Sequence, residues 1–130
     1  MSAPAVTEVD RPEVMAEVAA AFGAYEKALV AADIASLMEF FWDSPDVVRF
    51  GVADEQWGTA QLLAWRTANP GVPAGRVLTR TRISTFGSDT AVVSTLFSYP
   101  DGTALGRQSQ TWRLIGGAWR IVHAHVSSRV

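Results

Sequence analysis

Apolar side chains recur at helical spacing through the first part of the chain. The repeating positions are Val14, Val18, Phe22, Tyr25 and Leu29. Residues three or four positions apart lie on one side of an α-helix, so this pattern predicts an amphipathic helix. Asp10, three residues before Glu13, forms the pattern of a capping box, and Pro12 suits a first helical turn. We therefore expect the helix to begin just after Asp10.

Two shorter helices and a short strand are predicted in the middle of the chain. Asp33 can cap a helix whose apolar side chains are Ile34, Leu37, Met38 and Phe41. Pro45 lacks a backbone donor and ends this pattern. The run 47–50 has the composition of a short strand. Thr59 can cap a third helix that ends before Asn69.

The second half of the chain changes to the pattern of β-strands. Four runs rich in threonine, valine, isoleucine and aromatic residues are separated by turn-forming residues, and they span 76–86, 90–99, 105–115 and 118–127. Helices followed by an antiparallel meander are typical of an α+β domain. The 130 residues contain neither a repeat nor a dividing linker. We therefore expect a flexible N-terminal tail over residues 1–9 and a single domain over residues 10–130.

The last two predicted strands form a hairpin around Gly116 and Gly117, because glycine supplies the positive φ that a two-residue turn needs. Counted outward from this turn, the opposed pairs are Leu114–Trp119, Trp112–Ile121, Gln110–His123 and Gln108–His125. Side chains alternate along a strand, so these residues are predicted to share one face. Its polar end is either exposed surface or the lining of a pocket. For each histidine alone, an ordinary hydrogen-bonded role remains the alternative.

Three further features could carry chemistry. Tyr25 places a phenol in the apolar stripe of the first helix, where it is either a core residue or an acid aimed into a cavity. Arg49 lies between Val48 and Phe50, and if it points inward it needs an anion such as a substrate carboxylate. Asp54 and Glu55 form an acidic pair in a loop, which is either solvated or faces the pocket.

Composition and charge exclude several classes of protein. The formal net charge of −2 gives no electrostatic footprint for nucleic acid or an anionic membrane. The absence of cysteine excludes thiol catalysis and zinc–thiolate sites, and no carboxylate cluster completes a metal site with the two histidines. No apolar run approaches the ~20 residues that cross a bilayer. The chain also lacks nucleotide-binding glycine motifs, and residues 1–9 show neither the basic nor the apolar region of a secretory signal, so we expect none. We therefore expect a soluble, cytoplasmic protein without metal or cofactor.

Several segments of the chain resemble the NTF2-like (cystatin-like α+β cone) superfamily. The sharper similarity is to its AtzH-like branch, which also holds the oxalurate-catabolism protein HpxZ. The segments that carry the resemblance are 25–29, 41–45, 48–51, 106–112 and 119–127. It implies helices packed on a curved, mainly antiparallel sheet, with a pocket between them, and a homodimer of such subunits.

The resemblance also implies an activity and the residues that carry it. The activity of the branch is hydrolysis, with decarboxylation, of a small carboxylated urea. Tyr25 and Arg49 match the catalytic pair proposed for the family, with Arg49 holding a substrate carboxylate and Tyr25 acting as an acid or hydrogen-bond donor. The expected substrate-binding residues are Trp42, Glu55, Gln108, Gln110, Trp112, His123 and His125. Which of Asp54 and Glu55 faces the pocket stays open.

Two other classes of function remain compatible with the sequence. The chain could be a non-catalytic subunit that binds a small carboxylate or supports an amidase. It could also be an isomerase or cyclase of the ketosteroid-isomerase or SnoaL type, acting on an apolar ring. That chemistry needs an inward aspartate as base and a pocket without a central arginine, so an inward Arg49 would oppose it.

Overall fold

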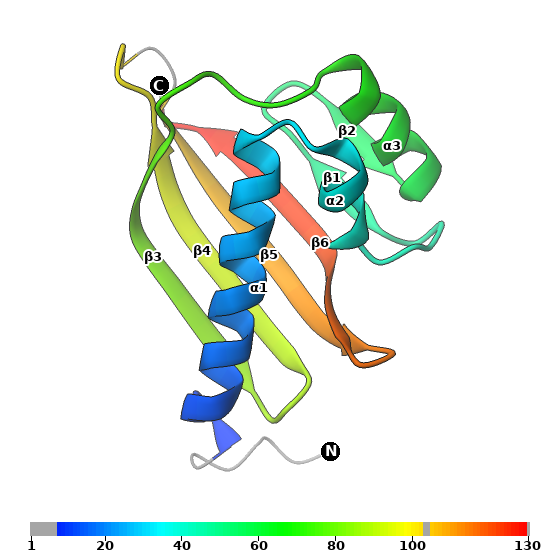
Figure 1. The fold of residues 1–130 in the computed structure, drawn as a ribbon, viewed down its shortest axis with the longest axis vertical. Coiled ribbons are helices and arrows are strands. Elements are labelled where there is room, and N and C mark those ends of the chain that lie inside the picture. The colour runs from blue at the N-terminus through cyan, green and yellow to red at the C-terminus, as the bar shows by residue number, and fades with distance from the viewer. Residues whose placement is uncertain (1–7, 103–104, 130) are drawn as a thin grey trace.

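Three helices cover one face of a six-stranded sheet in the computed structural model, which describes residues 8–102 and 105–129. The helices are α1 (Pro12–Val30), α2 (Ile34–Glu39) and α3 (Thr59–Ala68). Helix α1 crosses the concave side of the sheet, while α2 and α3 lie beside the short strands at one end (Figure 1). The predicted α+β class is confirmed.

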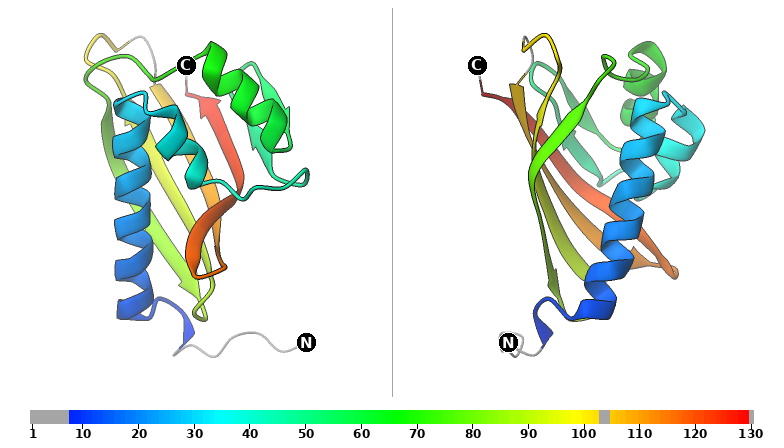
Figure 2. Two further views of the ribbon diagram at one scale, coloured as in Figure 1. Left: turned by 45° about the vertical axis from the view of Figure 1, so that its right-hand side comes forward. Right: turned by 60° about the vertical axis from the view of Figure 1, so that its left-hand side comes forward.

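The sheet is antiparallel except at one junction. Its strands are β1 (Val48–Phe50), β2 (Glu55–Trp57), β3 (Val77–Phe86), β4 (Thr90–Ser98), β5 (Leu105–Ile115) and β6 (Ala118–Ser128). They lie in the order β2-β1-β6-β5-β4-β3, and the parallel junction joins β1 to β6. Figure 2 shows the long strands bending around α1, as the resemblance to a cone implied.

Helix α1 buries the stripe that its sequence predicts. Val14, Val18, Phe22, Tyr25 and Leu29 are all buried. They pack with Trp112 and Ile121 of the sheet in one apolar core, and burying a side chain of this size stabilises the fold by about 1.5–3 kcal/mol.

The capping box predicted at the start of α1 does not form. Asp10 has a positive φ of 56°, and its carboxylate accepts a hydrogen bond from the Thr85 backbone at 2.8 Å. The N-cap of α1 is instead Arg11, whose side chain makes no capping bond. Asp10 thus ties the start of the helix to β3.

The hairpin between β5 and β6 is confirmed at its turn and wrong further out. Leu114 pairs with Trp119, and Trp112 pairs with Ile121, as predicted. A bulge then inserts one extra residue into β6, so that Thr111 pairs with His123 and Ser109 with His125. One extra residue reverses the face of every later side chain. His123 and His125 are therefore exposed on the outer face of the sheet.

Residues 1–7 of the predicted tail lie outside the described residues. Val9, which follows them, forms an antiparallel bridge with Phe86.

No helix in the described part of the chain combines the length and the apolar character that a membrane span requires.

Candidate functional site

Tyr25 lies at the centre of the candidate site, on the C-terminal half of α1. It is only 2% exposed, and its ring makes edge contacts with Phe40, Phe41 and Trp112 at centroid distances of 6.1–6.3 Å. Burial raises the pKa of the Tyr25 hydroxyl, and nearby arginines only partly oppose this shift. The phenol is therefore protonated at neutral pH and can donate a hydrogen bond.

Arg49 points inward from β1 and is already paired. Its Nη1 donates to Asp54 Oδ2 at 2.8 Å and to Gln56 Oε1 at 2.9 Å. The Gln56 amide also donates to Asp54 Oδ2, at 2.8 Å. The three side chains are thus hydrogen-bonded to one another, and the Asp54 carboxylate neutralises the Arg49 guanidinium and fixes its orientation. This guanidinium lies 4.5 Å from the centre of the Trp65 ring.

The acidic residue that reaches this site is Asp54. Glu55 is exposed on the outer side of β2, where its carboxylate accepts a hydrogen bond from the Trp57 indole at 2.8 Å. Neighbouring residues of a strand face opposite sides, so the inward Gln56 forces Glu55 outward. Glu55 therefore points away from Arg49 and Tyr25, and its role in substrate binding stays a prediction.

A second ion pair joins α1 to the start of β3. Arg76 Nε donates to Glu26 Oε1 at 2.8 Å, and its Nη2 donates to Gln108 Oε1 at 3.0 Å. The Tyr99 hydroxyl accepts a further bond from Arg76, and Gln108 also donates to Glu26. Burial lowers the pKa of Arg76, but the hydrogen bonds and charge of Glu26 outweigh it and the net direction is upward.

Arg66, on α3, is a buried cation without a matching anion. It is 4% exposed, its Nε has no hydrogen-bond partner, and none of the described carboxylates lies within ion-pair distance. Its guanidinium lies 5.1 Å from the centre of the Trp65 ring. Burial lowers the pKa of Arg66, the direction expected for a desolvated charge.

Gln110 also leaves a buried donor free. Its carbonyl accepts a hydrogen bond from the Trp112 indole at 3.0 Å, while its Nε2 has no partner. A buried polar group without a partner is costly, so such atoms mark places where a water or ligand belongs. Both unpartnered nitrogens, on Arg66 and Gln110, are hydrogen-bond donors.

The charged groups form one electrostatic cluster around Tyr25. Arg66, Glu26, Arg49 and Arg76 all influence its hydroxyl, with Arg66 the strongest of the four. Three guanidinium groups in this cluster face two carboxylates, those of Glu26 and Asp54. Of the three arginines, Arg66 is the one without a carboxylate within ion-pair distance among the described residues, and the charge of Asp54 acts on it from further away.

Two surface cavities are lined in part by residues of this cluster. One of about 430 Å³ is lined by Glu26 and Arg76. The other, of about 350 Å³, is lined by the loop 50–55, including Asp54, and by His125. The connection from α3 to β3 passes the C-terminal end of α1 (Figure 1), where Gly71 lies close to Ala32. Glu26 and Arg76 thus border one cavity and Asp54 borders the other, while neither cavity is lined by Tyr25 or Arg66.

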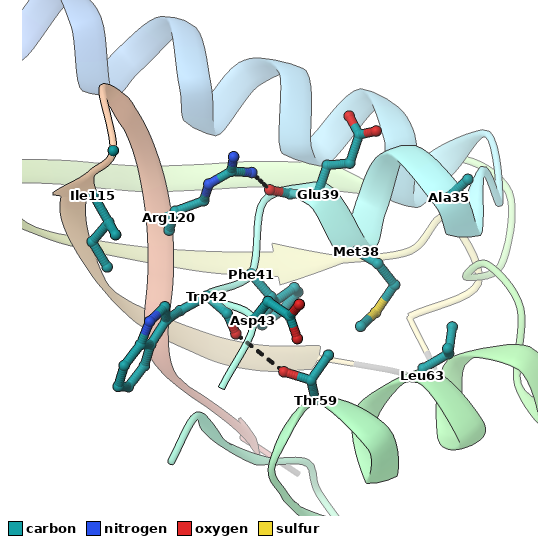
Figure 3. Close-up of a pocket in the computed structure, with 11 residues that line it drawn as sticks. Ala35, Met38, Glu39, Phe41, Trp42, Asp43, Thr59, Leu63, Ile115 and Arg120 are labelled. Carbon is teal, nitrogen blue, oxygen red and sulfur yellow. Dashed lines mark hydrogen bonds between the residues drawn. The ribbon is translucent and has the colours of Figure 1, made fainter. Parts of the chain in front are cut away.

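Trp42 belongs to a third cavity, outside the arginine cluster. This cavity measures about 740 Å³ and lies between α2, the start of α3 and the β5–β6 turn (Figure 3). The Thr59 hydroxyl donates to the Trp42 carbonyl at 3.3 Å, and Arg120 bonds the Glu39 carbonyl. The half-buried Trp42 therefore lines a different space from the one around Tyr25.

The structure brings together five of the residues predicted for the site and adds three more. Tyr25, Arg49, Gln108, Gln110 and Trp112 are buried together, whereas His123, His125 and Glu55 face outward. The additions are Glu26, Arg66 and Arg76. Glu26 follows Phe22 by four residues and Arg66 follows Leu62 by four, so both lie on the apolar side of their helices. This spacing is the sequence signal that could have identified them as buried residues. Among the described residues, no three histidine, aspartate or glutamate side chains are grouped to hold a metal.

Comparisons with known proteins place the chain in a family. The model of the AtzH-like family matches residues 7–129. A protein of unknown function from the DUF3225 family of Pectobacterium atrosepticum SCRI1043 is 42% identical, with 98% of this chain and 99% of that chain covered and a TM-score of 0.93. A cystatin-like fold protein from Burkholderia xenovorans LB400 is 46% identical, with 93% and 95% covered and a TM-score of 0.90.

A more distant structure shares the fold alone. It is an NTF2-like protein of unknown function from Pseudomonas putida KT2440, 20% identical, with 90% of this chain and 87% of that chain covered and a TM-score of 0.78. No curated protein matches the sequence. The chain belongs to the AtzH-like family and has the NTF2-like, cystatin-like fold.

Proposed function

We propose that the protein is a hydrolase that acts on a small carboxylated urea or a related amide. One observation carries this proposal: Arg66 is a buried cation without an anionic partner among the described residues. A planar guanidinium binds a carboxylate through two parallel hydrogen bonds, and a buried site strengthens them. The carboxylate of the substrate is the group that fits Arg66.

The contacts of the two arginines change the role first expected for Arg49. Arg49 already has Asp54 and Gln56 as acceptors, so Arg66 is better suited to take the substrate carboxylate. Both guanidinium groups lie over the Trp65 ring. Arg49 then supplies a second, fixed positive charge close to the bound group, and Gln110 Nε2 supplies a further donor.

Tyr25 would act on the reacting carbonyl. Its protonated hydroxyl can donate to the oxygen on which negative charge develops when water attacks the urea or amide carbon. The attack forms the C–O bond as one proton of the water passes to Glu26 or Asp54, the two carboxylates of the cluster. The C–N bond then breaks, and the carboxylate returns that proton to the nitrogen as it leaves. His123 and His125 face outward, so neither would take part in this transfer.

The test is product release from a panel of small carboxylated ureas and amides. Dicarboxyurea, allophanate, carboxybiuret, oxalurate and ureidoglycolate would each be incubated with the protein, and ammonia and CO2 followed. Turnover of one compound is expected, with loss in Tyr25→Phe and Arg66→Met. Arg113→Met, which changes an exposed arginine, is the matched control and should retain activity. Turnover that survives both site variants would overturn the assignment.

The second candidate is a non-catalytic subunit that binds a small carboxylate. One observation favours this role: neither of the two cavities beside the cluster is lined by Tyr25 or Arg66. Thermal stabilisation by one compound, dependent on Arg66 and without product at any pH, would support this role. An isomerase of the steroid type is disfavoured, because Arg49 and Arg66 both occupy the interior.

We also propose that the protein is a cytoplasmic homodimer that pairs through the outer face of the sheet. Trp57, Val77 and Phe86 are exposed on strands of this sheet. Burial of apolar side chains of this size favours association. Light scattering after chromatography should give twice the mass of the chain for the wild type and the single mass for Phe86→Arg.

A further inference from the structure

We propose that the outer face of the sheet carries a further binding site, which takes a multiply charged oxyanion such as a phosphate group. The site is a surface cavity of about 300 Å³ over strands β3, β4 and β5. Its guanidinium groups come from Arg80 and Arg107, and its hydroxyls come from Ser94 and Ser109. None of the residues that line this cavity is acidic. The inference goes beyond the proposed function, because the charged groups of this cavity are separate from the cluster around Tyr25.

The strand register places these side chains next to one another on one side of the sheet. Ser94 pairs with Ser109 across β4 and β5, and Arg82 of β3 pairs with Ser94 from the other side. Directly opposed residues of an antiparallel ladder lie on the same face. Ser109 also pairs with His125, whose side chain is exposed, so this side is the outer face. Three strands therefore supply the donors of one site.

A bulge in β3 brings Arg80 to this cavity. The register of β3 and β4 shifts between Thr79 and Arg82, and Arg80 has a positive φ of 54°. Residues other than glycine rarely adopt this conformation, and it persists where the surrounding structure holds it. The hydroxyl of the buried Thr95 lies 3.3 Å from the Thr79 carbonyl and 2.7 Å from the Thr81 hydroxyl. These two contacts hold the backbone on both sides of Arg80, and bulges of this kind redirect a side chain.

The guanidinium groups around the cavity have no carboxylate to balance them. Among the residues that the structure describes, none forms an ion pair with Arg80, Arg82 or Arg107. Arg107 Nη1 donates to the Ser128 carbonyl at 3.1 Å, which helps to position this guanidinium. Guanidinium groups bind phosphate and carboxylate oxygens through charge-assisted hydrogen bonds, and serine hydroxyls can donate to the same oxygens. Three positive charges without a lining carboxylate favour an anion with more than one negative charge.

The cavity lies on the face through which we propose that two copies of the chain pair. A bound anion would offset the repulsion between the arginines of the two copies, so the two proposals are compatible. Anion binding is therefore measured at a protein concentration where light scattering gives a single mass.

The test follows the binding of inorganic phosphate by two-dimensional NMR of the backbone amides, at constant ionic strength. The Ser94 and Ser109 signals should shift and saturate with phosphate but not with chloride. Arg80→Gln and Arg107→Gln should each weaken phosphate binding about tenfold, because each removes charge-assisted hydrogen bonds. Arg113→Gln changes another exposed arginine of β5, which pairs with Asp89, and should bind phosphate as the wild type does.

Malonate, tested in the same way, distinguishes the two sources of such an anion. Tighter binding of phosphate than of malonate would assign the site to phosphate groups. The reverse order, with the same arginine dependence, would support the site and assign it to dicarboxylates.

A second variant separates anion binding from a role in the fold. Arg80→Gly removes the guanidinium but suits the positive φ of the bulge. It should keep or raise the midpoint of urea denaturation while weakening phosphate binding about tenfold. A lower midpoint with unchanged phosphate affinity would show that Arg80 serves the fold alone, and would overturn the proposal.

Two other results would also overturn the proposal. One is a shift of the Ser94 and Ser109 signals that chloride reproduces at the same ionic strength. The other is phosphate binding that survives Arg80→Gln and Arg107→Gln in one chain. Neither result affects the proposed hydrolase, because the panel of ureas and amides tests the cluster around Tyr25.

Discussion

The two faces of the β5–β6 hairpin show how one strand pair serves different purposes. The inner face buries Gln108, Gln110 and Trp112 against α1. Gln108 accepts a hydrogen bond from Arg76, and Gln110 accepts one from the Trp112 indole. The outer face exposes His123 and His125, whose rings contact Phe50 at 5.8 and 5.5 Å. The bulge in β6 decides which residues belong to which face.

A similar contrast separates two interior arginines. Arg76 has a carboxylate, an amide and a phenol as acceptors, and its pKa is raised because the pairing with Glu26 outweighs burial. Arg66 has no such partners among the described residues, and burial lowers its pKa. The difference separates an arginine in a buried ion pair from a buried arginine without an anionic partner among the described residues.

The largest expected effect is a difference in the free energy of unfolding between variants of these two arginines. Arg76→Met leaves Glu26 buried without its cation and should lower the free energy of unfolding by about 3–5 kcal/mol. Arg66→Met removes a buried charge that lacks a partner, so it should leave this free energy unchanged or raise it. Urea denaturation of both variants measures the difference. Equal destabilisation by the two substitutions would show that Arg66 is structurally paired.

The next effect concerns the donor at the centre of the site. Tyr25→Phe keeps the ring contacts with Phe40, Phe41 and Trp112 but removes the hydroxyl. Loss of a donor to developing charge costs about 3 kcal/mol, or on the order of a hundredfold in kcat. Steady-state kinetics on the substrate found by the panel measures it. A change in KM with constant kcat would assign Tyr25 to binding rather than to the reaction.

The fold was largely predictable, because its signals are local. The stripe of Val14, Val18 and Phe22 predicts α1, and the glycine pair at 116–117 predicts the turn of the last hairpin. The bulge was not predictable from alternation, since Val122 continues a regular strand pattern. A bulge is fixed by contacts with neighbouring strands, and β1 pairs with β6 directly beyond it, at His123.

The candidate site was predictable only in part. Tyr25 and Arg49 stand out as polar residues in apolar patterns, and both are buried. Glu26 is buried because its spacing from Phe22 and Leu29 puts it on the inner side of α1, but this spacing alone does not distinguish it from a residue at the edge of the stripe. The roles of Arg66 and Arg76 depend on whether residues far away in the sequence supply a carboxylate or another hydrogen-bond acceptor. The spacing of residues along the chain does not predict such partners.

A smaller effect comes from the pH dependence of stability. The pKa of Tyr25 is raised in the folded state by burial. Above about pH 10 the unfolded chain loses this proton while the folded chain keeps it, so stability falls as the pH rises. The fall should reach about 1.4 kcal/mol for each pH unit until the folded pKa is reached. Urea denaturation at alkaline pH should show this component in the wild type and not in Tyr25→Phe.

The smallest effects are expected on the outer face. His123→Ala and His125→Ala change exposed side chains and should alter the free energy of unfolding by about 0.5 kcal/mol or less. Turnover and carboxylate binding should stay at the wild-type level, because neither side chain faces the cluster. A loss of activity in either variant would mean that the histidines reach the substrate, against the observed register.

The central claim is that Arg66 is the receptor for a substrate carboxylate. The most direct measurement is a crystal structure of the wild-type protein with bound malonamate. The account predicts the malonamate carboxylate within hydrogen-bond distance of the Arg66 guanidinium, with the Arg49–Asp54 pair intact. A carboxylate bound to Arg49 in place of Asp54, with Arg66 still unpartnered, would contradict it.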